Sequence, residues 1–276
     1  MAYENVQIQA VEYDMVVSKL RSFFRNRGFI EVPTQSRLSI LAACEDPRTI
    51  SSFDFAGNIW PLPQTGQMWL EYELLKDRSK PGFYCISTSY RNEPHPIAGR
   101  HDLIFPMFEF ELPGTMHDLK MLELALLEHL GFSKSVTMTY EDAAAQYNVR
   151  EITAQHEEWM GKDIGTCIFL ELFPEYTSPF WNMRRHNEHL ANKIDVLLHG
   201  METIGSAERS TNKIEMRNSF HTISDGAYAN ILYLKFGKER VEHELEEFLS
   251  FDLFPRAGGG IGITRMIRAL KLAHLL

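Results

Sequence analysis

The stretch from Phe83 to Leu112 constrains the fold most, because its two β-prone segments carry charged residues that a buried strand tolerates poorly. The first segment, up to Tyr90, is predicted to be a strand. Side chains alternate along a strand, so Arg91 and Glu93 are expected on the same face at its end. A cation and an anion would then emerge side by side where the strand stops.

A polar loop and a second strand follow. The loop contains two prolines, a glycine and two further basic residues: Pro94, Pro96, Gly99, Arg100 and His101. The returning strand is expected to place Phe105, Glu109 and Glu111 on one face, and Phe108 and Phe110 on the other. An aromatic ring, carboxylates and several cations would converge over one sheet face, which suits a nucleoside triphosphate. The alternative is a β-hairpin with a charged face toward solvent.

Composition and cysteine spacing exclude several classes of protein. The 276 residues carry a formal net charge of −9, which argues against a nucleic-acid contact spread over the whole surface but not against a local basic groove. Cys44, Cys85 and Cys167 form no CxxC pair, so neither a disulfide framework nor a zinc site is indicated. The first residues are too polar for a signal peptide, and no apolar run is long enough to span a bilayer. We expect a cytosolic protein with no membrane partner.

Helices are predicted near the N-terminus and before the central stretch. Apolar residues from Gln9 to Arg27 recur at helical spacing, and a short strand follows that Pro33 breaks. This unit suits a packing or dimer element, or an ordinary αβ pair. A second helix is expected over residues 65–76, where Gln67 and Glu71 share one face. These two side chains form either a surface that reads an amide or amine, or a solvated stripe; the pattern alone favours the stripe.

A later hairpin is predicted to present two carboxylates. His199 and Gly200 suit a two-residue turn, because glycine accepts the positive φ that such turns need. In that register Leu197 opposes Glu202, and Asp195 lies diagonally across from Glu202 on the same face. Mg²⁺ prefers carboxylate and phosphate oxygens, so the pair is a candidate cation site. Two exposed acids on an antiparallel sheet are the other interpretation.

A glycine-rich strand near the C-terminus leads into a helix that carries Arg265. Gly258, Gly260 and Gly262 would let the backbone approach a ligand closely. The pattern lacks the GK[ST] of a P-loop and the GxGxxG of a dinucleotide-binding fold. It suits a further phosphate contact through Arg265, or close glycine packing alone.

Three ordered blocks give the chain a family resemblance. GFIEV at residues 28–32, the block from YRNE to FEFE at residues 90–111, and GGGIGITR at residues 258–265 resemble the three signature motifs of class II aminoacyl-tRNA synthetase catalytic domains. TGQMWLE at residues 65–71 resembles SGQLYLE of the asparaginyl enzymes, and GMETIGSAER resembles their segment ending in GGSQR. The chain is therefore most similar to the aspartate, asparagine and lysine subgroup. The triple glycine also resembles ammonia-dependent asparagine synthetase, which shares the catalytic fold.

The resemblance implies an α+β fold with a class II synthetase-like antiparallel β-sheet flanked by helices. It implies a single catalytic domain over residues 1–276, and a homodimer. The helix before the first motif begins almost at Met1, so we expect no N-terminal anticodon-binding barrel.

The resemblance also implies roles for individual residues. Arg91 would hold the α-phosphate of ATP, Glu93 would fix ATP or the substrate amino group, and Phe105 would stack on adenine. The residues implied in ATP binding are Arg91, Glu93, Arg100, His101, Phe105, Gly260, Gly262 and Arg265. Among these, Arg91, Glu93 and Arg265 would serve catalysis, with Arg265 on the γ-phosphate.

The implied amino-acid and metal contacts lie elsewhere in the chain. Gln67 would meet the α-amino group of the substrate, while Glu71 and Arg209 would read its side-chain amide or carboxylate. Asp195 and Glu202 would carry Mg²⁺. No protein nucleophile would be needed, because positioning and charge neutralisation let the substrate carboxylate attack the α-phosphorus.

The sequence departs from the family pattern at several positions. The first motif's proline would fall at Gln35, whereas the chain has Pro33. Ile104 stands where related enzymes usually have an acid before the stacking aromatic. Glu208 replaces a common glutamine beside Arg209, which predicts a changed preference for the substrate side chain.

Three functions are consistent with these observations. The first is an ATP-dependent ligase resembling asparagine synthetase, which would convert aspartate through its adenylate to an amide with ammonia. The second is a minimal asparaginyl-type tRNA ligase, with tRNA as acceptor. The third is a non-catalytic paralogue that serves as a regulatory or binding subunit. The many charges expected around one cleft argue against the third, because such charges are costly to bury.

Overall fold

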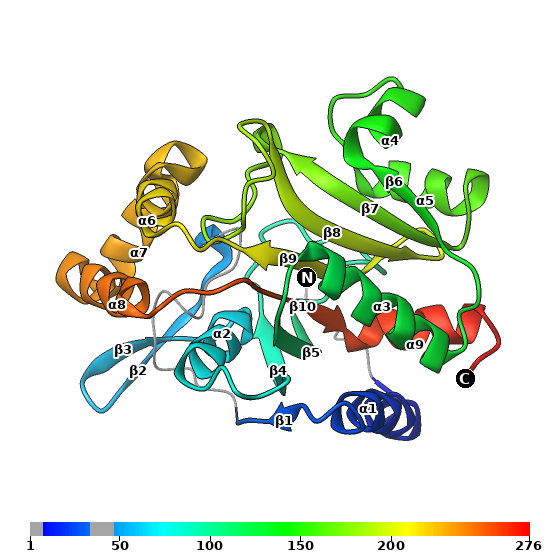
Figure 1. The fold of residues 1–276 in the computed structure, drawn as a ribbon, viewed down its shortest axis with the longest axis horizontal. Helices are drawn as coiled ribbons and strands as arrows, with labels where there is room; N and C mark the ends of the chain where they lie inside the picture. Colours follow the sequence, from blue (N-terminus) through cyan, green and yellow to red (C-terminus); the bar gives the residue numbers. More distant parts are fainter. Residues whose placement is uncertain (1–7, 34–46) are drawn as a thin grey trace.

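An eight-stranded sheet forms the centre of the computed structural model, which describes residues 8–33 and 47–276 (Figure 1). The strand order is β1-β4-β5-β10-β9-β8-β7-β6. The bounds are β1 (Ile30–Glu31), β4 (Phe83–Tyr90), β5 (Ile104–Pro113), β6 (Val136–Thr139), β7 (Cys167–Pro174), β8 (Leu190–Leu198), β9 (Glu202–Arg209) and β10 (Arg256–Gly262). The outermost pairs, β1 with β4 and β6 with β7, are parallel, and the pairs between them are antiparallel. The predicted α+β fold with a largely antiparallel sheet is confirmed.

Three helices cover one face of this sheet: α1 (Ala10–Arg25), α3 (Met116–Leu130) and α9 (Ile263–Leu272) (Figure 1). Their apolar sides enclose a core with Phe108 and Phe110 of β5. Helix α3 begins with a capping box between Thr115 and Asp118 and ends at Gly131, whose φ of 104° suits a residue without a Cβ. This face is therefore closed by hydrophobic packing.

The opposite face is only partly covered. Helices α2 (Gln67–Lys76), α6 (Lys213–Thr222), α7 (Ala227–Phe236) and α8 (Lys238–Ser250) share a second core around Trp181. Helices α4 (Tyr140–Gln146) and α5 (Ala154–Asp163) flank β6 and β7 at the other end of the sheet (Figure 1). The remaining elements are β2 (Ser52–Phe55), β3 (Asn58–Pro61) and the 3₁₀ turns η1 (Pro47–Thr49), η2 (Glu175–Thr177) and η3 (Ile223–Gly226). The middle of the sheet is left open on this side.

Predictions at the N-terminus are met in part. The predicted helix is α1, and the short strand is β1, which ends before Pro33. Gln35 and Cys44 lie outside the described residues. Cys85 and Cys167 are buried free thiols. Within the described ranges, no helix has the length and apolar character needed to cross a bilayer.

Candidate active site

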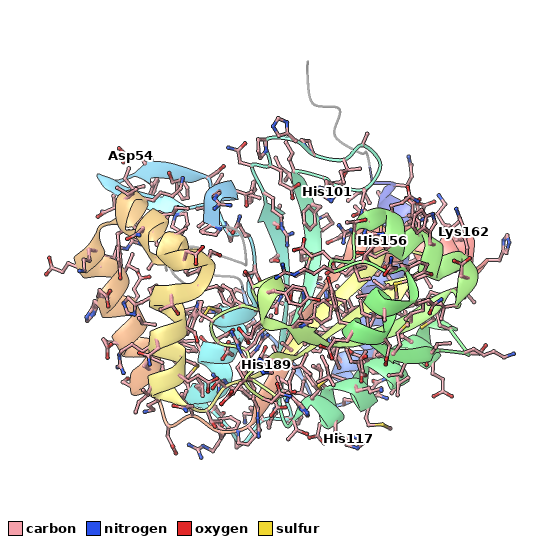
Figure 2. The ribbon with its side chains drawn as sticks, turned by 90° about the horizontal axis from the view of Figure 1, so that it is seen from above. Asp54, His101, His117, His156, Lys162 and His189 are labelled. Carbon is pink, nitrogen blue, oxygen red and sulfur yellow. The ribbon has the colours of Figure 1, made fainter. Side chains whose placement is uncertain are left out.

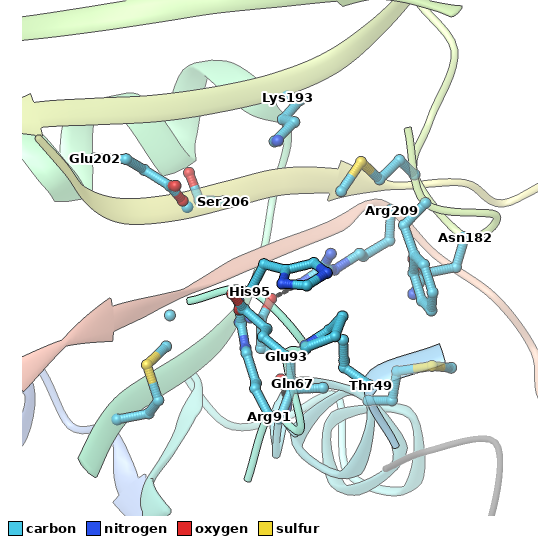
Figure 3. Close-up of a pocket in the computed structure, with 18 residues that line it drawn as sticks. Thr49, Gln67, Arg91, Glu93, His95, Asn182, Lys193, Glu202, Ser206 and Arg209 are labelled. Atoms are coloured by element: carbon cyan, nitrogen blue, oxygen red, sulfur yellow. Dashed lines mark hydrogen bonds between the residues drawn. The ribbon is translucent and has the colours of Figure 1, made fainter. Parts of the chain in front are cut away.

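Two adjoining cavities open over the exposed middle of the sheet, and Figure 3 shows the residues that line the larger one. The larger has a volume of about 440 Å³ and the smaller about 190 Å³. They share six lining residues: Arg91, Glu93, Met107, Glu202, Gly205 and Gly260. The two cavities are therefore parts of one cleft.

The hairpin of β4 and β5 supplies the wall common to both cavities. Arg91 and Glu93 follow directly after β4, and the Arg91 N–H donates to the Leu103 carbonyl at 2.8 Å, which closes the loop between the strands. The Arg91 guanidinium lies 5.4 Å from the centre of the Phe105 ring. Nδ1 of His101 lies 2.7 Å from Oε2 of Glu93. The predicted side-by-side placement of the cation, the anion and the aromatic ring is confirmed.

Glu109 does not face the cleft as a ligand group, although it lies on the predicted face. Its carboxylate accepts hydrogen bonds from the Thr65 and Ser87 hydroxyls, both at 2.5 Å, and from the Gly66 N–H at 2.8 Å. Burial raises the pKa of Glu109 despite these donors. Glu109 therefore anchors the start of α2, the helix that presents Gln67 to the larger cavity.

A buried charge network, made of Glu71, Glu111, Arg209 and Arg256, lies at the inner end of the larger cavity. Arg209 donates through Nε and Nη2 to Glu111 at 3.0 and 3.1 Å, and through Nη2 to Oε1 of Gln67 at 2.9 Å. Behind it, Nε of Arg256 donates to Oε2 of Glu71 at 2.8 Å. Glu71 is fully buried, so the solvated stripe that its spacing with Gln67 favoured is wrong. Tertiary contacts with an arginine 185 residues away overrode the local pattern.

Glycines in β10 make room for this network. A Cβ at Gly258 would collide with the carboxylate of Glu111, and one at Gly260 would lie 3.0 Å from Nε2 of Gln67 and 2.7 Å from Met107. Gly260 lines both cavities and Gly262 lines the smaller one. The glycine strand therefore allows close approach, as its composition predicted.

The predicted hairpin of β8 and β9 is present. His199 and Gly200 both have positive φ, 49° and 74°, as a two-residue turn of this kind requires, and Leu197 opposes Glu202. A register shift after Val196 then pairs Asp195 with Gly205, one residue beyond the uninterrupted register. This bulge is a feature that alternation alone could not predict.

The two carboxylates of this hairpin still converge. A Cβ at Gly205 would lie 2.9 Å from Oε1 of Glu202 and 3.6 Å from Oδ1 of Asp195. Glu202 lines both cavities, whereas Asp195 lines neither and lies 3.3 Å from Nζ of Lys193. Burial would raise the pKa of Glu202, but Arg265 and Lys193 together hold it below its ordinary value. Glu202 is therefore ionised at neutral pH.

Cations from two further elements line the smaller cavity. Arg265, in the first turn of α9, donates through Nη1 to the Glu202 carbonyl at 2.8 Å. Arg100, in the loop after β4, forms an ion pair with Glu157 of α5. The same Glu157 carboxylate accepts the Glu202 N–H at 3.0 Å. A side chain of α5 thus joins the loop to the hairpin that carries Glu202.

Histidines and cysteines do not assemble into a metal centre within the described ranges. There, no three His, Cys, Asp or Glu side chains form a group that could hold a metal ion. Figure 2 shows His117 and His189 far from His101. Asp195 and Glu202 are the carboxylate pair expected from the sequence, and two carboxylates suffice where a ligand supplies further oxygens.

Glu208 does not line either cavity, although it lies beside Arg209. Alternation turns it to the opposite face of β9, where it accepts from Arg184 at 2.7 Å and Asn192 at 2.8 Å. It also accepts the Met116 N–H at 3.1 Å, at the start of α3. Glu208 is therefore a helix-capping residue.

Most predicted site residues line the cleft, and two lie behind it. The larger cavity is lined by Gln67, Arg91, Glu93, Glu202, Arg209 and Gly260, and the smaller by Arg91, Glu93, Arg100, His101, Phe105, Glu202, Gly260, Gly262 and Arg265. Glu71 and Asp195 line neither cavity. Ile104, at the start of β5, is half exposed.

Several residues that line the larger cavity were not predicted from the sequence. Lys193 shares a strand face with Asp195 two residues later, and this spacing could have identified it. Asn182 follows an aromatic pair in an irregular segment, and no sequence signal marks it. Asn182 reaches the cleft because the backbone N–H of Ser210 donates to the backbone carbonyl of Asn182 at 2.8 Å. This bond holds the segment against the end of β9.

Comparisons with known proteins agree with this geometry. The family model described as tRNA synthetases class II (D, K and N) matches residues 4–274. No curated protein sequence matches the chain. Asparaginyl-tRNA synthetase from Pyrococcus horikoshii, solved with asparaginyl-adenylate, superposes with a TM-score of 0.76 at 17% identity, over 96% of this chain and 65% of that one.

Two further structures are similar. Asparaginyl-tRNA synthetase from Entamoeba histolytica, also with asparaginyl-adenylate, gives a TM-score of 0.74 at 19% identity, covering 94% of this chain and 63% of that one. A putative aspartyl-tRNA synthetase from Leishmania major Friedlin gives 0.74 at 14% identity, covering 96% and 63%. The chain thus spans less than two thirds of the length of these structures, and at such identities the likeness concerns the fold. Since the family model covers almost the whole chain, the protein belongs to the class II tRNA synthetases of the D, K and N group.

Proposed function

We propose that the protein binds ATP and an amino acid of the aspartate or asparagine type and joins them as an aminoacyl-adenylate, releasing pyrophosphate. The observation that carries this proposal is the continuity of the cleft. Its two cavities share the wall that contains Arg91 and Glu93, with cations of the loop and α9 on one side and the buried charge network on the other. An amino acid and a nucleotide placed in the two cavities would meet at Arg91.

The smaller cavity suits the nucleotide. Phe105 offers an aromatic face, and Arg100, His101 and Arg265 offer donors for phosphate oxygens. Arg91 lines both cavities, which suits a contact with the α-phosphate at the point of reaction. Glu93 already orients His101 and can also accept from an amino group.

The larger cavity suits the amino acid. Gln67 enters it from α2, and its carbonyl oxygen, held by Arg209, can accept from an α-ammonium group. Arg209 then faces the substrate side chain. Both residues are fixed by the buried charge network before any substrate binds.

The reaction needs no protein nucleophile. An oxygen of the substrate carboxylate attacks the α-phosphorus, and the bond from that phosphorus to the bridging oxygen of pyrophosphate breaks. Arg91 would stabilise the charge that develops on the α-phosphate, and the cations around Arg265 would stabilise the departing pyrophosphate. Asp195 and Glu202 would hold Mg²⁺, and this ion would neutralise phosphate charge.

The acceptor of the aminoacyl group separates two versions of this function. With aspartate and ammonia, the product would be asparagine, as in ammonia-dependent asparagine synthetase. With a tRNA 3′ end, the product would be an aminoacyl-tRNA, as expected of a synthetase that charges asparagine. Both versions require the adenylate, so adenylate formation is tested first.

Pyrophosphate exchange measured with each of the twenty amino acids tests the proposal. We expect exchange with aspartate or asparagine, followed by transfer to ammonia or to tRNA when product is analysed. Arg91→Ala should lower exchange about 100-fold or more, because it removes a preorganised donor to the developing charge. Arg217→Ala is the matched control, since Arg217 pairs with Glu246 on the surface of α6 and α8.

Two results of these exchange measurements would contradict the proposal. A folded protein that supports no exchange with any amino acid would be the non-catalytic paralogue, and the proposed activity would be wrong. An Arg91→Ala variant with the wild-type exchange rate would refute the placement of the α-phosphate.

A further inference from the structure

The side-chain end of the larger cavity depends on a buried ion pair that local sequence did not reveal. Glu71 and Arg256 are both completely buried, and Oε2 of Glu71 accepts from Nε of Arg256 at 2.8 Å and lies 2.5 Å from its Nη2. The guanidinium of Arg256 only donates hydrogen bonds, so Glu71 acts as the acceptor in this pair. The second oxygen of Glu71 then sets the orientation of the polar side chains that contact it.

That second oxygen, Oε1, contacts Asn182 and Arg209 together. Nδ2 of Asn182 donates to it at 2.6 Å, and Nε of Arg209 lies 3.8 Å from it. Because Oε1 accepts from Nδ2 and also faces the Arg209 guanidinium, which only donates, the Asn182 amide is oriented with Nδ2 toward Glu71 and Oδ1 away from it. Figure 3 shows Asn182 and Arg209 next to each other at the same end of the cavity.

Oδ1 of Asn182 is left without a partner. Asn182 is 1% exposed, and within the described part of the chain Oδ1 makes no hydrogen bond. A buried acceptor in this state is costly unless a ligand supplies a donor. The residue lines the larger cavity, so a ligand bound there can supply one.

Arg209 provides the complementary group. Its bonds to Glu111 and Gln67 use Nε and Nη2, and it lines the same cavity. The end of the cavity therefore offers a donor from Arg209 beside an acceptor from Asn182. A carboxamide matches both, because its carbonyl accepts and its NH₂ donates, whereas a carboxylate only accepts.

We propose that Asn182, oriented by Glu71 and Arg256, is a specificity-determining residue that selects a substrate side chain ending in a carboxamide over one ending in a carboxylate. This inference rests on the proposed function. It favours asparagine over aspartate as the activated amino acid. The reaction is then not the formation of asparagine from aspartate and ammonia, and the aminoacyl group passes to another acceptor. Lys193 does not reverse the preference, because its charge faces Asp195.

The test compares asparagine with aspartate in two assays. Pyrophosphate exchange gives the ratio of kcat/KM values, and calorimetric titration with each amino acid gives the ratio of affinities without any chemistry. We expect the wild type to prefer asparagine by roughly 100-fold or more, because aspartate would bring an anion to an unpaired acceptor. Wild-type preference for aspartate, equal affinity, or binding of neither amino acid would overturn the inference.

Two variants separate selection from simple structural support. Asn182→Leu should reduce the ratio of asparagine to aspartate, in kcat/KM and in affinity, at least tenfold, mainly because asparagine binds more weakly. Glu71→Gln can donate to Oδ1 of Asn182, so it permits the amide to turn and should move the preference toward aspartate. If Asn182 had only a structural role, its substitution would lower kcat/KM and affinity equally for both amino acids and leave their ratio unchanged.

Asn192→Leu is the matched control. Asn192 is also a buried asparagine that donates to a glutamate, Glu208, at 2.8 Å, but it does not line the cavity. Its substitution should leave the ratio as in the wild type. If exchange is absent with every amino acid while titration still shows the asparagine preference, the proposed function fails and the assignment of Asn182 stands.

Discussion

The two ends of the cleft hold their charges in different ways. In the buried charge network, no side chain is more than 4% exposed, and every member bonds to another member. At the opposite end, which we call the loop end, Arg265 and His101 are 26% and 28% exposed. The substrate side chain would therefore meet groups that are already fixed, whereas the phosphates would meet cations that water still reaches.

This difference has an energetic consequence. A buried charge that loses its partner cannot be solvated, so the network is costly to break. A partly exposed cation gains little from its protein partner and loses little when a phosphate replaces it. The buried end is thus suited to discriminating between substrates, and the loop end to exchanging partners during a reaction.

The largest predicted effect is on stability and compares Arg256 with Arg265. Arg256→Ala leaves Glu71 buried and unpaired, so it should lower the free energy of unfolding by about 3–5 kcal/mol. Arg265→Ala, at the loop end, should lower it by less than about 1 kcal/mol. Urea denaturation at pH 7 measures both.

A double variant separates charge from packing. Glu71→Gln combined with Arg256→Met removes both charges and keeps most of the volume, so it should recover much of the stability that Arg256→Ala loses. Equal losses for Arg256→Ala and Arg265→Ala would remove the energetic distinction between the two ends.

The second prediction concerns Glu123, a buried carboxyl that lacks the pairing found in the network. Glu123 lies on α3 and is fully buried; the nearby Ser206 hydroxyl does not offset this burial, and no ion pair to Glu123 forms within the described residues. The nearby Lys120 pairs with Glu171 instead, at 2.7 Å. Burial raises the pKa of Glu123 to about 8, so the folded protein holds a proton that the unfolded chain releases near pH 4.5.

The sign of the effect follows from this difference. Between pH 4.5 and about 8 the folded state binds more protons, so stability falls as pH rises through this range. Glu123→Gln stays neutral, and its stability relative to the wild type should increase by about 2–4 kcal/mol from pH 4.5 to pH 8.5. Denaturant titrations at several pH values measure this difference. Glu128→Gln, on the exposed side of the same helix, should show no such trend, and a flat difference for Glu123→Gln would mean that Glu123 is ionised when folded.

The loop end could be predicted from sequence because its residues are consecutive or nearly so. Alternation along one strand placed Arg91 and Glu93 together, and the returning strand brought Phe105 over them. The same argument placed Asp195 near Glu202 across a two-residue turn. Strand geometry acts over a few residues, so local patterns are sufficient here.

The buried end could not be predicted in this way. Glu71 meets an arginine from β10 and an asparagine from an irregular segment, 185 and 111 residues away. No periodicity links these positions, and a helical stripe was the natural expectation for Glu71. The bulge after Val196 was missed for a related reason, because one extra residue breaks the alternation on which the register depends. The expected homodimer, the Mg²⁺ pair and the roles of individual residues stay predictions.

The smallest predicted effect tests an exception at the loop end. Arg100 is 8% exposed there, because Glu157 of α5 pairs with it and also accepts the Glu202 N–H at 3.0 Å. Glu157 does not line either cavity, so it would act by positioning Arg100 and Glu202 rather than by touching a ligand. Glu157→Gln keeps the shape but removes the charge, and ATP would then have to order Arg100 on binding. The KM for ATP should rise about tenfold, with the KM for the amino acid unchanged.

Steady-state pyrophosphate exchange with each substrate varied in turn distinguishes this positioning role from general damage. Glu158→Gln changes the next residue of α5, which is exposed, and should leave both KM values at the wild-type level. A Glu157→Gln variant that raised both KM values together would indicate a disturbed cleft rather than a misplaced Arg100. A Glu157→Gln variant with an unchanged KM for ATP would mean that Arg100 does not need α5 to hold its position. Arg100 would then be no exception to the partly exposed cations of the loop end.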